Sequence, residues 1–447
     1  MVGKRAGYVA LVGRANVGKS TLFNRLTRTR QAIVHDQPGV TRDRHYGLVE
    51  TEAGSFTLID TGGFEPKAEE GLPRLMRSQV ETAIDEADAV ILLLDGRQGI
   101  TPLDMEIAGR LRRSSKKVVA AVNKLDDPSL ENLTSDFYGL GLDNFLPLSA
   151  EHGLGVDGLL EAVVPLLPEV DEVQKGEEEG MIRVAVVGRP NVGKSSLINR
   201  VLGSERMVVS EVPGTTRDAV DSVLELEGRS YLLIDTAGIR KPGRVKKGVE
   251  RWSVIRALKA MERADVAVIL VDAEEGLTDQ EARVCGMAVE RGRAVVLAFN
   301  KWDLMTDPDR TFKDFKDVLA YKLKFLSFIP WLVVSAKTGR NLGRIFKAVD
   351  SVHEQYRHRA PTAEVNRVLE EALAHHQPPL AGRSRLKFYF ATQARTKPPT
   401  FVVFTNHPDK VHFSYARYLG NRFREAFGLD LIPVRVLFRS RRRKDMV

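Results

Sequence analysis

The sequence holds a single cysteine, Cys285, among its 447 residues. One cysteine cannot form an internal disulfide bond, which fits the reducing conditions of the cytoplasm. No apolar run approaches the roughly 18 to 20 residues that a membrane-spanning helix requires, so we expect a cytoplasmic protein without a membrane span. Cys285 lies in an apolar, helical stretch at 281–289, where a buried structural thiol is a simpler interpretation than a catalytic nucleophile.

Acidic residues are scarce in the last fifth of the chain. Positions 356–447 contain 18 Lys and Arg against 7 Asp and Glu, a net charge of +11. Because the whole chain carries +8, the rest of it is slightly acidic. A region charged in this way attracts polyanions, and nucleic acid is the usual one. The nine histidines show no spacing that is typical of a zinc site.

The most informative feature that is present is a repeated octapeptide. Gly-Arg-Ala-Asn-Val-Gly-Lys-Ser occupies 13–20, and Gly-Arg-Pro-Asn-Val-Gly-Lys-Ser follows 175 residues later at 188–195. Both fit the phosphate-loop pattern, in which backbone N–H groups at the start of a helix hold the phosphates of a nucleotide. One match can arise by accident. The later motifs are repeated in the same order, however, so we expect two nucleotide-binding domains in tandem.

Short apolar runs alternate with helical periods in both repeats, which is the pattern of a mostly parallel sheet flanked by helices. Each motif follows an apolar run. The motifs are Asp-Thr-Gly-Gly at 60–63 and Asp-Thr-Ala-Gly at 235–238, Asn-Lys-Leu-Asp at 123–126 and Asn-Lys-Trp-Asp at 300–303, and Ser-Ala at 149–150 and 335–336. A ligand bound outside the carboxyl ends of a parallel sheet touches all of these loops.

Composition also indicates the domain boundaries. The first domain spans 1–168, and an acidic, glycine-containing linker without apolar periodicity follows at 169–181. The second domain spans 182–358 and ends in an amphipathic helix. Residues 359–447 form a third, basic domain. Its pattern predicts helix, strand, strand, helix and strand at 363–375, 386–392, 400–405, 411–427 and 434–438.

The residue types in these motifs suit a nucleoside triphosphate with magnesium. Each repeat supplies a lysine for the β- and γ-phosphates, a serine and a threonine hydroxyl for Mg²⁺, and an aspartate behind the metal. They are Lys19, Ser20, Thr41 and Asp60 in the first repeat, and Lys194, Ser195, Thr216 and Asp235 in the second. The threonines lie in Pro-Gly-x-Thr-Arg-Asp segments, where a mobile loop can close on the metal.

The Asn-Lys-x-Asp motif selects the base. A carboxylate accepts two adjacent hydrogen bonds, which suits the N1–H and 2-amino donors of guanine. Adenine offers no such pair and would leave Asp126 or Asp303 against an acceptor, a mismatch that costs roughly several orders of magnitude in affinity. Asparagine is expected to face acceptors of the base, lysine to lie along its ring, and alanine to offer an N–H. These residues are Asn123, Lys124 and Ala150, and Asn300, Lys301 and Ala336. The predicted ligand is GTP rather than ATP.

The motifs together define the nucleotide-binding residues of both sites. The first site comprises Gly13, Arg14, Ala15, Asn16, Val17, Gly18, Lys19, Ser20, Asp60, Thr61, Gly62, Gly63, Phe64, Asn123, Lys124, Leu125, Asp126, Ser149 and Ala150. The second site comprises Gly188, Arg189, Pro190, Asn191, Val192, Gly193, Lys194, Ser195, Asp235, Thr236, Ala237, Gly238, Ile239, Asn300, Lys301, Trp302, Asp303, Ser335 and Ala336.

A side chain that many GTPases use is missing from both sites. A glutamine just after the Asp-x-x-Gly motif commonly orients the attacking water, but Phe64 and Ile239 stand at these positions. Hydrolysis is therefore expected to be slow without help. Asn16 and Asn191, inside the phosphate loops, are candidates to hold a monovalent cation that neutralises the charge developing on the phosphates. The alternative is that they only fix the loop.

These motifs resemble those of the bacterial Der (EngA) family over essentially the whole chain. The resemblance rests on the two phosphate loops, the repeated Pro-Gly-x-Thr-Arg-Asp and Asp-Thr-[Gly/Ala]-Gly motifs, the acidic linker and the basic α/β tail. It implies an α/β fold with two tandem P-loop GTPase domains and a C-terminal KH-like domain. It also implies a factor for assembly of the large ribosomal subunit, and potassium-stimulated GTP hydrolysis with K⁺ bound at Asn16 and Asn191.

We therefore predict a monomeric, GTP-hydrolysing switch that binds the large ribosomal subunit and its rRNA, with 64–80 and 239–252 as moving loops. The third domain lacks a Gly-x-x-Gly clamp, so it is expected to pack against the GTPase domains or to touch rRNA through its arginines. Two alternatives stay open. A tRNA-modifying GTPase should carry a cofactor domain and often a reactive C-terminal cysteine, and an RNA-binding module with structural nucleotide should tolerate loss of Lys19 or Lys194.

Overall fold

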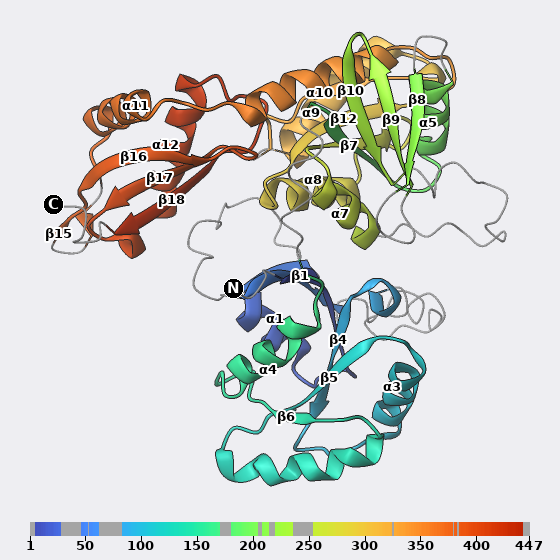
Figure 1. The fold of residues 1–447 in the computed structure, drawn as a ribbon, viewed down its shortest axis with the longest axis vertical. Helices are drawn as coiled ribbons and strands as arrows, with labels where there is room; N and C mark the ends of the chain where they lie inside the picture. Colours follow the sequence, from blue (N-terminus) through green and yellow to red (C-terminus); the bar gives the residue numbers. More distant parts are fainter. Residues whose placement is uncertain are drawn as a thin grey trace. The chain divides into compact units, whose positions relative to one another are not determined.

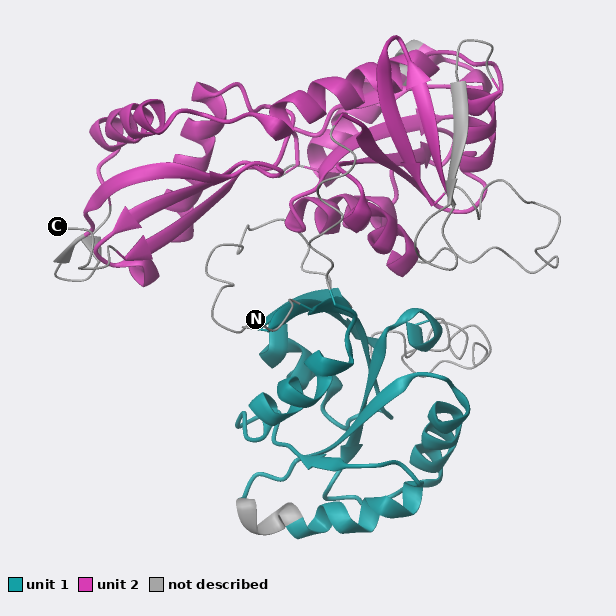
Figure 2. Cartoon of the chain, viewed as in Figure 1, with its two compact units in different colours: residues 1–32, 42–177 teal, residues 33–41, 178–447 magenta. Residues whose placement is uncertain are grey.

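The computed structural model divides the chain into two compact units (Figure 2). Unit 1 comprises residues 1–32 and 42–177 and holds the first repeat, whereas unit 2 comprises 33–41 and 178–447 and holds the second repeat together with the third domain. The residues that the structure describes are 5–27, 46–51, 53–61, 83–169, 180–203, 208–213, 220–235, 254–323, 326–378, 380–381 and 384–440.

The sheet of unit 1 has six strands in the order β2-β3-β1-β4-β5-β6 (Figure 1). Neighbouring strands run parallel, except for the antiparallel pair of β2 and β3. The strands are β1 (Arg5–Val12), β2 (Tyr46–Thr51), β3 (Gly54–Asp60), β4 (Ala89–Asp95), β5 (Lys117–Asn123) and β6 (Phe145–Pro147). The helices are α1 (Lys19–Thr27), α3 (Pro102–Arg113) and α4 (Val156–Val163), with 3₁₀ segments η3 (Pro128–Leu140) and η4 (Val164–Leu166).

Helices cover both faces of this sheet. Val9 and Leu11 of β1 belong to a core with α1 and α4, while the alternate residues Ala10 and Val12 belong to a core with α3. A central parallel strand that is buried on both faces needs a continuous apolar run, and β4 is accordingly buried along its whole length. The predicted architecture of a mostly parallel sheet flanked by helices is confirmed.

The second repeat forms a seven-stranded sheet in the order β13-β12-β11-β7-β10-β9-β8. Only β10 with β9 and β9 with β8 pair antiparallel. The strands are β7 (Ile182–Val187), β8 (Val208–Pro213), β9 (Val220–Leu226), β10 (Arg229–Ile234), β11 (Val266–Asp272), β12 (Ala294–Asn300) and β13 (Trp331–Val333). The helices are α5 (Lys194–Leu202), α7 (Val254–Arg263), α8 (Asp279–Glu290), α9 (Pro308–Lys322) and α10 (Leu342–Arg357), with 3₁₀ segment η6 (Trp302–Leu304).

Cys285 lies in α8 and is fully buried. Burial raises the pKa of its thiol, because the thiolate would lose its hydration there. The interpretation of Cys285 as a buried helical residue is confirmed.

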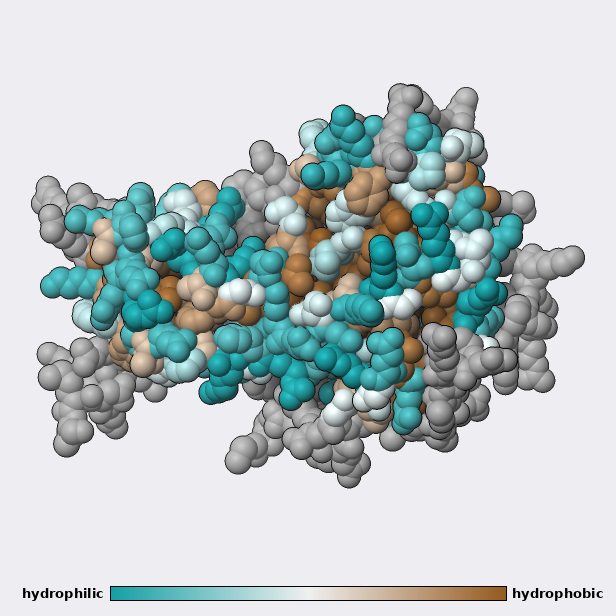
Figure 3. Space-filling model, turned by 90° about the horizontal axis from the view of Figure 1, so that it is seen from above, coloured by the Kyte–Doolittle hydropathy of each residue, from teal (hydrophilic) through white to brown (hydrophobic). Residues whose placement is uncertain are grey.

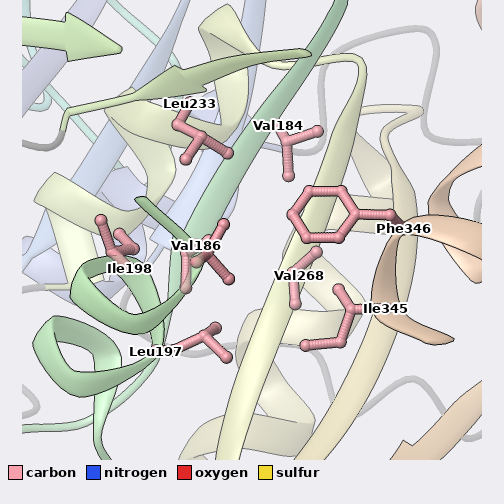
Figure 4. A pocket seen from close by; sticks show the side chains of 9 residues that line it. Val184, Val186, Leu197, Ile198, Leu233, Val268, Ile345 and Phe346 are labelled. Carbon is pink, nitrogen blue, oxygen red and sulfur yellow. The ribbon is translucent and has the colours of Figure 1, made fainter. Parts of the chain in front are cut away.

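A small apolar cavity lies between α5, α10 and the sheet of the second repeat (Figure 4). Its walls are Val184, Val186, Leu197, Ile198, Val201, Leu233, Val268, Ile345 and Phe346. A ligand site needs a few polar groups that fix orientation, and every side chain here is a hydrocarbon. The cavity is therefore part of the packing that supports α5.

The third domain folds as helix, strands, helix and strand, as the sequence predicts. Its elements are α11 (Thr362–His375), β14 (Leu380–Ala381), β15 (Ser384–Arg385), β16 (Phe388–Arg395), β17 (Thr400–Thr405), η7 (Pro408–Lys410), α12 (Phe413–Ala426) and β18 (Arg435–Ser440). The sheet order is β16-β17-β18, with β17 and β18 parallel. Phe401 of β17 stacks on Phe423 of α12, with 4.6 Å between ring centroids. The short β14–β15 pair is an addition that the sequence pattern does not predict.

The third domain packs against the second repeat inside unit 2. Lys397 forms a 2.8 Å ion pair with Asp265, just before β11, and its backbone N–H donates a 3.0 Å hydrogen bond to the carbonyl of Tyr356 in α10. Arg435 donates to the carbonyl of Glu290 at the end of α8. Of the two expected roles for this domain, packing against a GTPase domain is therefore seen. The face of unit 2 in Figure 3 is mainly hydrophilic, with smaller hydrophobic areas.

A buried histidine lies beside the Lys397–Asp265 pair. His353 of α10 is 6% exposed, and burial together with the Lys397 cation lowers its pKa to about 4. Asp265 opposes this shift, while Arg357 and Arg229 add to it. His353 is therefore neutral in the folded chain at neutral pH.

Within the described part of the chain, no helix has both the length and the apolar character to cross a membrane.

Candidate nucleotide-binding sites

Each phosphate loop connects the carboxyl end of a central strand to a helix, from β1 to α1 and from β7 to α5. Lys19 Nζ donates to Gly13 O and Arg14 O, at 2.7 Å each. Lys194 Nζ makes the same two contacts in the second loop, at 2.8 Å each. Both lysines are therefore held in the concave side of the loop at a helix N-terminus, where anions bind in proteins.

Asn16 and Asn191 have the same backbone conformation, with φ of 63° at each. Asparagine adopts this left-handed region more readily than most residues. Both side chains are exposed, and neither amide has a hydrogen-bond partner among the described residues. The two asparagines are thus equivalent and remain available to a ligand at the loop.

The asparagines of the Asn-Lys-x-Asp motifs join the phosphate loop to the loop after the next strand. Asn123 Nδ2 donates to Val17 O at 2.7 Å, and Ala150 N donates to Asn123 Oδ1 at 2.8 Å. Asn300 makes the same pair of contacts, to Val192 O at 2.7 Å and from Ala336 N at 2.8 Å. In the structure these groups hold two loops together, so contacts of Asn123, Asn300, Ala150 and Ala336 with a base remain a prediction.

This close approach explains a glycine in each phosphate loop. A Cβ on Gly18 would lie 2.3 Å from Asn123 Nδ2, and a Cβ on Gly193 would lie 2.2 Å from Asn300 Nδ2. The glycines also have φ of 101° and 96°, where side chains are strained. The second glycine of the motif is thus required by the asparagine as much as by the turn.

The carboxylates predicted to bind the base each accept a hydrogen bond from a serine hydroxyl. Asp126 Oδ1 accepts from Ser149 Oγ, and Asp303 Oδ1 accepts from Ser335 Oγ, both at 2.6 Å. The serine hydroxyl lowers the pKa of each carboxyl, so both are ionised at neutral pH. Asp126 also pairs with Arg97, whereas Asp303 has no ion pair among the residues that the structure describes.

The lysines of the same motifs are oriented by acids that lie outside the motifs. Lys124 Nζ lies 2.6 Å from Asp95 at the end of β4, and Lys301 Nζ lies 2.5 Å from Asp272 at the end of β11. Lys124 lowers the pKa of Asp95, against the desolvation that burial imposes. A signal exists in the sequence, because each aspartate ends an apolar run in both repeats.

A second set of missed acids holds the arginine of each phosphate loop. Arg14 Nε contacts Asp104 at 3.2 Å, and Arg189 Nε contacts Glu281 at 2.7 Å. Both acids are completely buried and belong to the capping boxes that begin α3 and α8. Arg189 also reaches Glu275 at 2.5 Å. The Thr-x-x-Asp and Thr-x-x-Glu capping patterns were readable in the sequence, but their contact with the loop was not.

The aspartates predicted to lie behind the metal differ between the sites. Asp60 ends β3, and its carboxylate accepts from Ser20 Oγ at 3.3 Å. Asp235 follows the end of β10 with φ of 58°, and within the described residues no hydrogen bond joins it to Ser195. Burial raises the pKa of Asp235, although Arg256 and Arg263 oppose this. A hydrogen bond joins the predicted pair in the first site, and none joins it among the described residues of the second.

The remaining predicted positions fall into two groups. Thr61 donates to Leu11 O at 2.7 Å, Leu125 N donates to Leu148 O at 3.1 Å, and Trp302 is buried beneath its motif. Ala15 and Pro190 lie within the two phosphate loops. Nine predicted positions lie outside the described residues, as do segments 64–80 and 239–252: Thr41, Gly62, Gly63, Phe64, Thr216, Thr236, Ala237, Gly238 and Ile239.

Comparisons with known proteins agree with this arrangement. A family model described as "50S ribosome-binding GTPase" matches 8–124 and 183–301. A model described as "KH-domain-like of EngA bacterial GTPase enzymes, C-terminal" matches 359–439.

Full-length relatives match as well. GTPase Der from Geobacter metallireducens is 50% identical over 437 residues, covering 98% of this chain and 99% of the relative. GTPase Der from Syntrophobacter fumaroxidans is 51% identical over 439 residues, covering 97% and 98%. A crystal structure of Era from Aquifex aeolicus bound to GDP.AlF4- covers 69% of this chain and 98% of its own at 22% identity, but its TM-score of 0.32 adds nothing to the assignment. The chain belongs to the GTPase Der family, with two tandem GTPase domains followed by a KH-like domain.

Proposed function

We propose that this GTPase is a switch with two GTP sites that acts in assembly of the large ribosomal subunit. The observation that carries the proposal is the match of both repeats to a family described as 50S ribosome-binding GTPases. The net charge of +11 over 356–447 supplies the attraction to rRNA. Relatives that cover nearly the full chain disfavour a tRNA-modifying enzyme, which would need a further cofactor domain.

The proposed sites bind GTP through three separate groups of residues. Backbone N–H groups of 13–20 and 188–195 face the phosphates, and Lys19 and Lys194 move from the loop carbonyls to the β- and γ-phosphates. Asp126 and Asp303 are ionised and supported by serine hydroxyls. Each can therefore accept both donors of guanine.

Magnesium fits the donors of the first site. Ser20 Oγ and an Asp60 carboxylate oxygen lie 3.3 Å apart, and Mg²⁺ prefers such oxygen ligands while keeping several waters. We propose that Ser20 and Thr41 hold the ion in the first site, and that Ser195 and Thr216 hold it in the second. The bound ion would neutralise charge on the β- and γ-phosphates.

Potassium is the further proposed activator. Asn16 and Asn191 share one left-handed conformation and point no amide at a described residue, while Phe64 and Ile239 cannot orient a water. A cation at these asparagines would supply positive charge to the phosphates during hydrolysis. GTP turnover in KCl and in NaCl at equal ionic strength tests this. Equal rates, or a potassium effect that survives Asn16→Ala with Asn191→Ala, would remove the assignment.

The proposed layout places the domains at 1–168, 182–358 and 359–447, with the linker at 169–181 and moving loops at 64–80 and 239–252. We propose that the protein works as a cytoplasmic monomer. Its two sites would then couple their nucleotide state to the affinity of one chain for one ribosomal particle.

Co-sedimentation with ribosomal particles tests the proposed partner. The full chain is mixed with large and small subunits in potassium buffer, with a non-hydrolysable GTP analogue, with GDP or without nucleotide. Binding to large-subunit particles in the analogue alone is the expected result. Binding that is independent of nucleotide would argue against a switch, and absence of binding in every state would refute the ribosomal role while leaving the GTPase intact.

A further inference from the structure

A buried carboxylate beside the second site has no counterpart in the first. Asp221 is the second residue of β9 and is 5% exposed. Its Oδ1 accepts from the backbone N–H of Asp235 at 3.0 Å, and its Oδ2 pairs with Arg263 at the end of α7. We call these contacts the Asp221 bridge. One carboxylate thereby connects three elements: strand β9, the motif aspartate Asp235 and helix α7.

The bridge coincides with the difference between the two sites. In the first site, β3 runs through Asp60, which pairs in register with Leu11 and accepts from Ser20 Oγ. In the second site, β10 stops one residue earlier, at Ile234. Asp235 then takes φ of 58°, and its N–H turns to Asp221. Aspartate adopts this left-handed region more readily than most residues, and the Asp221 carboxylate accepts from its N–H in this conformation.

Both ends of the bridge are changed in the first repeat. The 175-residue spacing that relates Asp60 to Asp235 places Tyr46 opposite Asp221, and the shared Ala-Asp pairs at 87–88 and 264–265 place Glu86 opposite Arg263. A tyrosine and a glutamate cannot reproduce a carboxylate–guanidinium pair. A carboxylate–guanidinium pair at these two positions is therefore specific to the second repeat.

We infer that Asp221, anchored by Arg263, is a positioning residue that holds Asp235 in its left-handed conformation, without the serine contact of the first site, and makes the second site the more demanding of the two for Mg²⁺. The inference rests on the proposed function, because it assumes that the second site binds GTP with Mg²⁺. Binding of Mg²⁺ there requires Asp235 to leave the left-handed region and its N–H to leave Asp221. The first site already has its serine and aspartate together and needs no such step.

The simpler alternative is that the Asp221 bridge only stabilises the fold. In that case its loss would weaken the site or leave it unchanged, because nothing would oppose the binding conformation. A bridge that holds the unbound conformation has the opposite effect, since its loss favours the bound one. The direction of the change therefore separates the two roles.

The test uses the full chain carrying Lys19→Ala, so that the second site dominates the signal. A fluorescent, non-hydrolysable GTP analogue is titrated with Mg²⁺. Asp221→Ala is expected to lower the Mg²⁺ concentration for half-saturation by about three- to tenfold, the factor expected when one state loses a hydrogen bond. Glu225→Ala is the matched control, because it removes an exposed carboxylate from the same strand and should change nothing.

Two milder variants guard against misfolding. Asp221→Asn keeps an acceptor for the Asp235 N–H but loses the charge that attracts Arg263, and Arg263→Gln loses the same attraction from the other side. Each should produce a smaller shift in the same direction. An unchanged or higher Mg²⁺ requirement in a folded variant overturns the inference. So does loss of fold in all three variants, which would make the bridge structural in every state.

The reciprocal change gives an independent readout. In a chain carrying Lys194→Ala, the double substitution of Tyr46→Asp and Glu86→Arg should raise the Mg²⁺ requirement of the first site. A chain with Lys19→Ala and an unaltered bridge that binds no analogue at any Mg²⁺ concentration would instead refute the second GTP site, and the inference with it.

Discussion

The two GTPase domains use one set of motifs in two different electrostatic settings. Their phosphate-loop lysines, asparagine contacts and base-reading aspartates have nearly the same distances. What surrounds these residues differs. The second loop arginine has two carboxylate partners where the first has one at close range. The serine and aspartate are joined by a hydrogen bond in the first site, and no such bond is present among the described residues of the second. The contacts that the motif residues make are thus repeated more faithfully than those of the residues around them.

Substituting the phosphate-loop lysines should cause the largest loss of GTP turnover, and the loss should be nearly equal at the two sites. Lys19→Ala and Lys194→Ala each remove the cation that meets the β- and γ-phosphates, so turnover at the altered site should fall about a thousandfold. Nucleotide stoichiometry, measured by isothermal titration, should drop from two to one in either variant. Normal turnover by both variants would revive a structural role for the nucleotide.

The base-reading aspartates come next. Asp126→Asn and Asp303→Asn replace one acceptor by a donor, so affinity for GTP at the altered site should fall about a hundredfold or more. Xanthosine triphosphate, whose base presents an acceptor in place of the 2-amino group, should recover much of the binding. Equilibrium binding of both nucleotides to each variant is the measurement. A uniform loss for both nucleotides would point to misfolding instead of base selection.

Removing the buried acid that holds each loop arginine should destabilise the two phosphate loops to different extents. Asp104→Ala leaves the 12% exposed Arg14 side chain without its close partner, which costs about 3 kcal/mol in a buried pair. Glu281→Ala should cost less, because Arg189 keeps Glu275. Hydrogen exchange at the amides of each phosphate loop measures the local loss. Equal losses at the two sites would show that the exposed Glu275 contributes nothing.

The smallest expected difference between the units is in how acid changes their free energy of unfolding. The folded pKa of His353 is lowered to about 4 from an ordinary value of about 6.5, so the unfolded chain binds the extra proton between these values. Stability from the neutral histidine is complete above pH 6.5 and is lost as the pH falls toward 4, on the order of 2 kcal/mol. Urea unfolding followed by hydrogen exchange at several pH values should show this loss in unit 2. His353→Gln should abolish it.

The sequence predicts what local patterns encode. The apolar runs of β1, β7 and the other motif-bearing strands, the phosphate loops and the elements of the third domain are all read from neighbouring residues, and the structure contains them. Pairs between distant residues are different. Arg14 lies 90 positions from Asp104, and Arg189 lies 92 from Glu281. No periodicity relates such positions, and only the fold brings them together.

The attachment of the third domain was predictable only in outline. Its missing Gly-x-x-Gly clamp suggested packing against a GTPase domain, but nothing in the sequence singles out Lys397 or its partner Asp265. A lysine between a threonine and a proline reads as a surface loop residue. Its role depends on a carboxylate from another domain that has been buried by the folding of β7 and β11.

Helix α8 can be regarded as a strut. At its first turn Glu281 pairs with the arginine of the second phosphate loop, and at its last residue the carbonyl of Glu290 accepts a hydrogen bond from Arg435 of the KH-like domain. The twelve residues of α8 extend over about 18 Å, so one continuous helix connects the two contacts. A displacement of the loop arginine that shifted α8 would therefore also shift the contact with the KH-like domain. Conversely, a partner that fixed the KH-like domain would restrain α8 and, through Glu281, the arginine of the second phosphate loop.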